Sequence, residues 1–286
     1  MTYLTAFLLG LVQGVAEFLP ISSSGHLAIA QNLLHIEGAG SVPEFFDVLL
    51  HLGTLIAVFA AYWGDIRDMV VEFFRGIAAM FSRQPGQGEP PETRRLVFLV
   101  IVGTLPLFLI LPVKKYVEGL GSSPVFVSFA LLVTGCILFL SDRMATGRKT
   151  ARSATVKDVL LVGVAQGIAT IPGLSRSGCT ISAGMALGFR REFAVRYSFL
   201  MSLPAVFGAT LLEVKDTLSA GAGIPDGMLG KYLLGMVIAG VVGYFAIRLV
   251  NLLADKGKFG AFAYYCWIAG AIFLVLSLLG VTFVHA

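Results

Sequence analysis

The amino-acid sequence predicts an all-α integral membrane protein, with six transmembrane helices and two re-entrant helical hairpins arranged as an inverted-topology repeat. Three observations predict this fold: the composition, the apolar runs of spanning length, and two interrupted apolar segments that match each other. Of the 286 residues, 57% are hydrophobic and 13% are charged, and the mean hydropathy is +0.86. Soluble domains carry about 25% charged residues. The composition therefore excludes an ordinary soluble enzyme and favours a chain that lies in a bilayer.

Six apolar runs approach the roughly 20 residues that a helix needs to cross a bilayer. They lie at 45–63, 96–113, 124–141, 196–213, 232–254 and 261–284. Two further apolar stretches, 3–36 and 156–188, are each interrupted by a turn rich in Pro, Gly and Ser. Their arms are short for a span, and a polar turn at membrane depth must line a protein cavity. We therefore expect each stretch to form a re-entrant hairpin.

The two interrupted stretches match each other in sequence. GLVQGVAEFLPISSSG at 10–25 aligns without gaps with GVAQGIATIPGLSRSG at 163–178. The identical pairs are Gly10/Gly163, Gln13/Gln166, Gly14/Gly167, Ala16/Ala169, Ser22/Ser175, Ser24/Ser177 and Gly25/Gly178. We therefore expect a single membrane domain of two repeats, 1–150 and 151–286, each with one hairpin and three spans. Because three spans invert the second repeat, the two turns are expected to meet at the repeat interface.

The basic residues predict the orientation in the membrane. Most of the 21 Lys and Arg residues fall in four of the predicted loops. These loops are 64–95, 142–157, 188–196 and 255–260. The excess of positive charge places them on the cytoplasmic side. Because the basic residues lie between apolar runs and not in one patch, we expect no nucleic-acid partner.

Three ionisable residues fall within the predicted hairpins. Charge at membrane depth is costly and therefore indicates function. Glu17 lies four residues after Gln13, so the two share a helix face. His26 follows the first Ser/Gly turn, and Arg176 lies at the position equivalent to Ser23. The purely structural alternative is that Glu17 and Arg176 form a buried ion pair that binds no substrate, and that His26 caps a helix.

The two Ser/Gly turns are suited to an anion, because each offers backbone N–H groups and hydroxyls ahead of a short helix. Arg176 adds a charged fork that matches phosphate oxygens. Glu17 would repel an anion, so we expect it to hold a divalent cation or to transfer a proton. His26 is a candidate general base or nucleophile, and Ser23 is a candidate nucleophile. The candidate phosphate ligands in the turns are Ser22, Ser24, Gly25, Ser175, Ser177 and Gly178. Together these residues predict phosphoryl transfer or hydrolysis within the membrane.

At these residues the sequence resembles a known family. QGVAEFLPISSSGH at 13–26 and PGLSRSG at 172–178 resemble the two signature motifs of the bacitracin-resistance type undecaprenyl-diphosphate phosphatases, and the resemblance extends over essentially the whole chain. It implies hydrolysis of undecaprenyl diphosphate to undecaprenyl phosphate and phosphate. That reaction recycles the lipid carrier of peptidoglycan synthesis and gives bacitracin resistance. The resemblance also implies a multi-pass protein of the bacterial inner membrane, with its site open to the periplasmic face.

The same resemblance implies roles for single residues. It places catalytic roles on Glu17, Ser23, His26 and Arg176, and secondary phosphate contacts on Ser175, Ser177 and Thr180. It also implies dependence on a divalent cation, Mg²⁺ or Ca²⁺. Glu17 and Gln13 are the candidate metal ligands, with Gln13 at a position where the family pattern has Glu or Gln.

An inverted-repeat transporter or flippase for a phosphorylated lipid or an anion is the alternative function, because hairpins at the midplane also serve transport. Glu17 and His26 favour hydrolysis, because catalysis needs an acid and a base whereas anion transport does not. The acid-phosphatase-like lipid phosphatases share the turn Ser24-Gly25-His26, but they also require a His five residues after their Ser-Arg motif. In this sequence no His follows Arg176 until His285, which excludes that class. The sequence leaves open whether Ser23, His26 or a water molecule is the nucleophile. It also leaves open whether the protein forms a homodimer.

Overall fold

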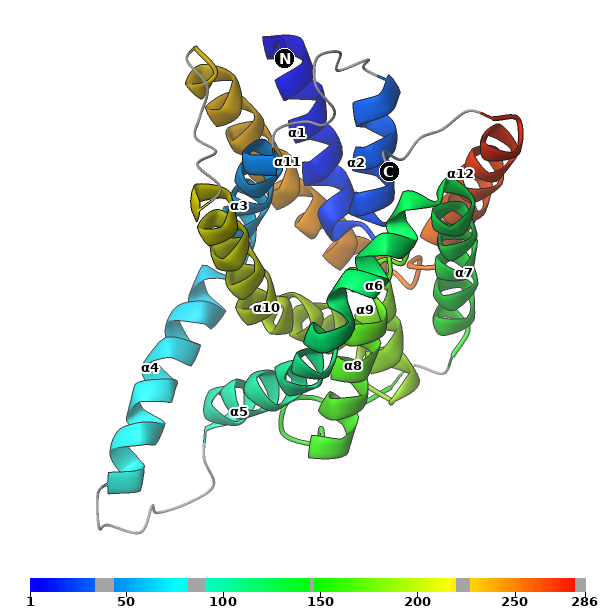
Figure 1. Ribbon diagram of the computed structural model, residues 1–286. Helices are drawn as coiled ribbons and strands as arrows, with labels where there is room; N and C mark the ends of the chain where they lie inside the picture. The colour runs from blue at the N-terminus through cyan, green and yellow to red at the C-terminus, as the bar shows by residue number, and fades with distance from the viewer. Residues whose placement is uncertain (34–43, 82–90, 145–146, 220–226, 281–286) are drawn as a thin grey trace.

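The computed structural model describes residues 1–33, 44–81, 91–144, 147–219 and 227–280. Within these ranges the chain is helical apart from its turns and one bridge between Lys149 and Phe189. The α-helices are α1 (Tyr3–Phe18), α2 (Ser23–Leu33), α3 (Glu44–Ala61), α4 (Trp63–Phe81), α5 (Glu92–Thr104), α6 (Lys114–Gly119), α7 (Pro124–Asp142), α8 (Val156–Ile168), α9 (Arg176–Ala186), α10 (Arg191–Ser219), α11 (Leu229–Asp255) and α12 (Ala261–Leu278). The prediction of an all-α chain is confirmed (Figure 1).

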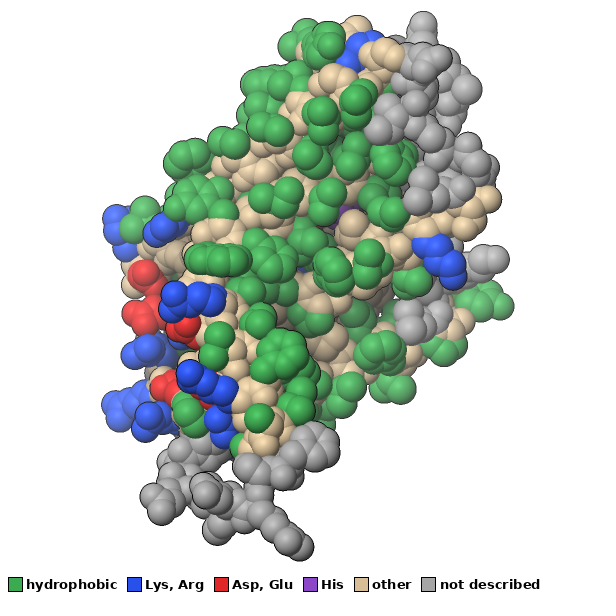
Figure 2. Space-filling model, turned by 90° about the vertical axis from the view of Figure 1, so that its left-hand side faces the viewer, with side chains coloured by type: hydrophobic (Ala, Val, Ile, Leu, Met, Phe, Trp, Pro, Cys, Tyr) green, Lys and Arg blue, Asp and Glu red, His purple; other side chains and the backbone are tan. Residues whose placement is uncertain are grey.

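Several of these helices have the length and apolarity of membrane spans. They are α7, α11, α12 and the segment Arg191–Leu212 of α10. Helices α3 and α4 pass the same test only as a pair, and they are bent from each other by 83°. Figure 2 shows hydrophobic side chains over most of one face, with acidic and basic side chains gathered along one edge. The chain is therefore a multi-pass membrane protein.

The prediction of one continuous span over 96–113 is wrong. Helix α5 ends at Thr104, and two 3₁₀ helices follow, η1 (Leu105–Leu109) and η2 (Leu111–Val113). Pro106 and Pro112 have no backbone N–H and so interrupt the α-helical hydrogen bonding in this stretch. The hydroxyl of Thr104 also donates to the carbonyl of Val100 at 2.8 Å. Apolar composition predicted the length of the run, whereas the prolines decide how much of it is α-helical.

The two predicted hairpins each form a pair of short helices around a turn. Helices α1 and α2 make the first pair, and α8 and α9 make the second. The end of the first predicted stretch, at 34–36, lies outside the described residues, as does the end of the last predicted span at 281–284. Figure 1 shows the two pairs in different halves of the molecule, α1 and α2 above α8 and α9.

Glycines let the first helix of each pair approach a neighbouring helix closely. A Cβ on Gly10 of α1 would lie 2.5 Å from the carbonyl oxygen of Gly235 in α11. A Cβ on Gly163 of α8 would lie 2.1 Å from the carbonyl oxygen of Gly103 in α5. Side chains larger than hydrogen would push these helices apart, which is the usual reason for glycine between membrane helices. The two helix pairs are therefore seated on their neighbours in the same way.

The apolar core connects the helix pairs with α10. The ring of Phe18, at the end of α1, lies edge-on to Phe199 of α10 with 5.7 Å between centroids. Phe199 also contacts Tyr62, between α3 and α4, at 6.0 Å. Both Phe18 and Phe199 are buried. This packing holds the end of α1, and with it the first turn, against the centre of the molecule.

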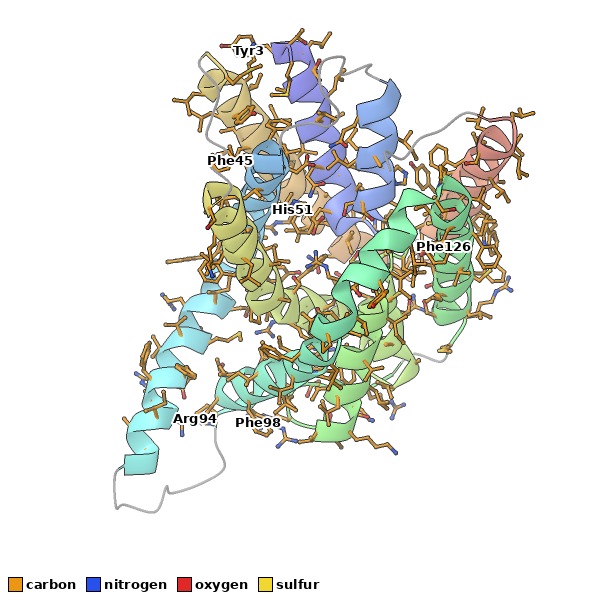
Figure 3. All side chains as sticks on the ribbon, viewed as in Figure 1. Tyr3, Phe45, His51, Arg94, Phe98 and Phe126 are labelled. Carbon is orange, nitrogen blue, oxygen red and sulfur yellow. The ribbon has the colours of Figure 1, made fainter. Side chains whose placement is uncertain are left out.

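Helix α4 lies at the edge of the molecule and packs against α5. Figure 3 places Arg94 and Phe98 on α5 next to α4, and His51 on α3 far from them. An apolar groove of about 550 Å³ separates α4 from α5, and Arg94 bonds Glu72 of α4 at 3.0 Å on its wall. This groove belongs to the charged edge and not to the region of the turns.

Candidate active site

The two Ser/Gly turns lie against each other in the folded chain. The hydroxyl of Ser177, in the second pair, donates to the carbonyl of Leu19, in the first, at 3.4 Å. A Cβ on Gly178 would lie 3.3 Å from Cβ of Pro20. The thiol of Cys266 in α12 also donates to the carbonyl of Pro20 at 3.6 Å. Turns that are more than 150 positions apart in the sequence therefore share one site.

The first turn contains a strained residue. Ser22 has φ of 69° and is the non-glycine residue with positive φ among those the structure describes. A left-handed conformation of this kind is costly for a residue with a Cβ, and it tends to occur at functional sites. The conformation directs the carbonyl of Ser22 at the ring of His26 and leaves its hydroxyl 3.4 Å from that of Ser24.

The second turn also contains a residue with positive φ, but that residue is a glycine. Here Gly173 takes the positive φ of 92°, and a Cβ at this position would lie 2.6 Å from the carbonyl oxygen of Val127. Ser175 caps α9, because its hydroxyl accepts the N–H of Gly178 at 3.1 Å. The hydroxyls of Ser175 and Ser177 are 3.3 Å apart. Each turn thus holds a pair of serine hydroxyls at the start of a short helix, an arrangement that suits an anion. Ser22, Ser175 and Ser177 are buried.

An ion pair joins the two turns. Nη2 of Arg176, the first residue of α9, lies 2.5 Å from Oε1 of Glu17 in α1. The Glu17 side chain is 8% exposed and that of Arg176 is 24% exposed. Nε2 of Gln13 donates to the other carboxylate oxygen of Glu17 at 3.1 Å. The structure therefore brings Arg176 to Gln13 and Glu17, which the sequence had placed on one helix face, and leaves the guanidinium partly accessible.

His26 is oriented by the first turn and by α12. Its Nδ1 lies 2.8 Å from the carbonyl of Ser22, so Nδ1 carries the proton, since a carbonyl only accepts. Nε2 is then the acceptor, and it receives the hydroxyl of Tyr265 at 2.7 Å. The two rings stack with 5.6 Å between centroids. In this tautomer the basic lone pair of His26 lies on Nε2, where it accepts the Tyr265 hydroxyl.

Tyr265 was not predicted as a site residue. It lies in the last apolar run, in the segment AFAYYCW, where aromatic residues are common at membrane interfaces. Nothing in that local pattern separates Tyr265 from its neighbour Tyr264. Only the packing of α12 beside the first helix pair brings its hydroxyl to His26.

The remaining predicted phosphate ligands differ in their accessibility. Ser23 is half-buried and begins α2, Ser24 is exposed, and Gly25 is buried. The Thr180 hydroxyl instead donates to the carbonyl of Arg176 at 2.9 Å and lies 2.5 Å from the hydroxyl of Ser198 in α10. Thr180 is 1% exposed, so its observed contacts hold α9 in place.

The structure offers oxygen donors for a hard cation near the ion pair. Oε1 of Gln13 is buried without a hydrogen-bond partner, and Glu17 lies beside it. No group of three or more His, Cys, Asp or Glu side chains suited to a metal occurs among the described residues. Mg²⁺ commonly takes one or two protein oxygens and completes its shell with phosphate and water. The donor set therefore fits a cation that binds together with a phosphate.

Comparisons with known proteins place nearly the whole chain in one family. The pattern of the bacitracin resistance protein BacA family matches residues 6–272. The chain is 41% identical to the undecaprenyl-diphosphatase of Methanosphaera stadtmanae over 283 residues, which covers 96% of this chain and 98% of the relative. It is 42% identical to that of Halothermothrix orenii over 270 residues, which covers 94% and 96%. It is 41% identical to that of Alkaliphilus metalliredigens over 289 residues, which covers 98% and 100%. The chain belongs to the bacitracin resistance protein BacA family.

Proposed function

We propose that the chain hydrolyses undecaprenyl diphosphate to undecaprenyl phosphate and inorganic phosphate, and that the paired turns are its active site. The name undecaprenyl-diphosphatase, shared by full-length relatives at about 40% identity, supports the reaction. The contact between Glu17 and Arg176 is the observation that carries the site, because it joins an acid and a phosphate-binding cation from two distant helix pairs. The product is the lipid carrier of peptidoglycan synthesis, and its recycling accounts for bacitracin resistance.

Arg176 and the turn hydroxyls bind the terminal phosphoryl group in this proposal. The guanidinium and the N–H groups at the start of α9 stabilise the charge that develops as the bond between the phosphorus and the bridging oxygen breaks. Either a water molecule held by the turns attacks the phosphorus, or Ser23 attacks it to form a phosphoserine that water then hydrolyses; in both cases undecaprenyl phosphate is the leaving group. His26 takes the proton of the attacking hydroxyl on Nε2, the atom that lies 2.7 Å from the Tyr265 hydroxyl.

The residues Gln13 and Glu17 would hold a divalent cation, Mg²⁺ or Ca²⁺. The unpartnered Oε1 of Gln13 supports this assignment. A cation bound there supplies additional positive charge to the phosphate oxygens. Glu17 also keeps Arg176 extended towards the turns, since the two side chains bond directly.

The proposed topology is an inverted repeat of residues 1–150 and 151–286, each with one re-entrant helix pair and three spans. The matching glycine contacts of α1 with α11 and of α8 with α5 support it. The basic loops then lie in the cytoplasm. In this orientation the turns open to the periplasmic side, where the diphosphate is released by wall synthesis.

Phosphate release from undecaprenyl diphosphate by the purified protein in detergent tests the proposal. The assay compares Mg²⁺, Ca²⁺ and a chelator, for the wild type and for Arg176→Ala. Cation-dependent release that the variant lacks is the expected result. A folded wild type that releases no phosphate under any of these conditions would overturn the hydrolase, and lipid or anion flux in liposomes would then test the transporter.

A further inference from the structure

Gln166 of α8 is a buried amide without a hydrogen bond on either polar atom. The residue is 2% exposed, and neither Nε2 nor Oε1 has a partner. In the part of the chain that the structure describes, the other buried side-chain atoms of this kind are Oε1 of Gln13 and the hydroxyl of Tyr232. An unpaired buried amide destabilises the folded chain, so its presence calls for a reason.

The position of Gln166 points to the paired turns. It lies in the last turn of α8, just before the second Ser/Gly turn, as Gln13 lies before the first. Its neighbour Gly163 packs on Gly103, in the same way that Gly10, beside Gln13, packs on Gly235. Gln13 and Gln166 therefore occupy matching places on matching helices, and both are buried.

The two glutamines differ in their hydrogen-bond partners. Gln13 donates to Glu17, four residues later. The residue four positions after Gln166 is Thr170, whose hydroxyl donates to the carbonyl of Gly167 at 2.7 Å. Thr170 is thus bonded to its own helix end, and Gln166 keeps both a donor and an acceptor. A group that can use both is a phosphate with its bound water or hydroxyl.

We propose that Gln166 is a second substrate-binding residue, which donates from Nε2 to a phosphoryl oxygen on the side of the site that holds Ser23. The inference rests on the proposed function and on the repeat. Ser23 is equivalent to Arg176, so the relation that brings Glu17 to Arg176 also brings the end of α8 towards Ser23. Gln166 then faces the phosphate from the wall opposite the ion pair. Its Oε1 accepts from the Ser23 hydroxyl or from the attacking water.

The variant Gln166→Met separates this role from packing, because methionine keeps the length of the side chain and removes both polar atoms. We expect its melting temperature to equal or exceed that of the wild type, since an unpaired buried amide is lost. We expect kcat/KM for undecaprenyl diphosphate to fall about tenfold or more, mainly through KM, since a hydrogen bond to a charged group is lost. Gln166→Glu should fall at least as far, because a carboxylate repels the phosphate.

Tyr232→Phe is the matched control. It also removes a buried polar atom without a partner, but Tyr232 packs against Phe45 and Phe46 of α3, away from the turns. We expect unchanged kcat/KM and an equal or higher melting temperature for this variant.

The outcomes separate this inference from the proposed function. A folded wild type without activity would overturn the function itself. An active wild type, an inactive Arg176→Ala and a Gln166→Met variant with wild-type kcat/KM would overturn only the role of Gln166. If Gln166→Met does not fold, Gln166→Glu is measured in its place, and wild-type kcat/KM in that variant overturns the inference equally.

Discussion

The two helix pairs present the same scaffold with different chemistry. Both turns carry two serine hydroxyls at the start of a short helix, and both first helices pack through glycine on a neighbouring helix. The first pair adds Glu17 and His26, whereas the second has Thr170 and Cys179 at the matching positions and adds Arg176. The shared scaffold is suited to bind an anion from both sides. The differences place the carboxylate and the imidazole on one side and the permanent positive charge on the other.

The largest expected effect comes from removing the charge of the second turn. Arg176→Ala should lower phosphate release by about 10²–10³-fold or more, the loss typical of one transition-state donor. Arg176→Lys keeps the charge without the fork and should recover part of the activity. Turnover and a melting curve check both variants. Near-wild-type release by Arg176→Ala would remove Arg176 from the site.

The next effect tests whether the position of His26 is needed for activity while the matching position of the second helix pair, Cys179, is not. His26→Ala should lower kcat by about 10²-fold, the lower end of the range for a general base. Cys179→Ala changes the matching position of the second pair and should keep kcat within about twofold, since Cys179 serves packing there. Steady-state kinetics of the two variants make the comparison. Equal losses in both would mean that the two positions act through the fold.

The third effect concerns the backbone of the second turn, where Gly173 has the positive φ that Ser22 has in the first turn. Gly173→Ala puts a Cβ 2.6 Å from the carbonyl of Val127 at a φ of 92°. We expect it to lower the free energy of unfolding by more than about 1 kcal/mol. Gly119→Ala, where a Cβ meets nothing within 4 Å at a helical φ, is the control and should leave the stability equal or higher. Thermal unfolding in detergent measures both, and equal stabilities would contradict the close approach of the second turn to α7.

The smallest effect concerns the strained serine. Ser22→Gly relieves the φ of 69° and should raise the free energy of unfolding by about 1 kcal/mol or less, because glycine adopts this conformation at little cost but loses more entropy on folding. The same variant removes one hydroxyl from the first turn, so kcat/KM should fall modestly. A melting temperature below that of the wild type would show that Ser22 stabilises the turn through its side chain.

Much of this molecule follows from local sequence. The low content of charge and the apolar runs predicted an all-α membrane protein, because a chain in lipid must satisfy its backbone within helices. The interrupted segments at 3–36 and 156–188 predicted two helix pairs, since Pro, Gly and Ser break a helix wherever they occur together. Glu17, His26 and Arg176 were chosen as candidate site residues because charge is rare in such segments. The two signature motifs also led to the family, which the comparisons confirm.

The contacts between distant parts of the chain were decided by the tertiary structure. The meeting of Glu17 with Arg176, the hydroxyl of Tyr265 on His26, and the buried amide of Gln166 without a partner depend on how helices pack. Composition and periodicity register only whether a residue lies in an apolar helix, so they separate neither Tyr265 from Tyr264 nor Gln166 from a packing residue. The prolines after Thr104 likewise ended a helix within a run that is apolar throughout. The sequence therefore determined which ionisable side chains lie at membrane depth. The packing of the helices, which approach each other closely at glycines, decided which of those side chains are in contact.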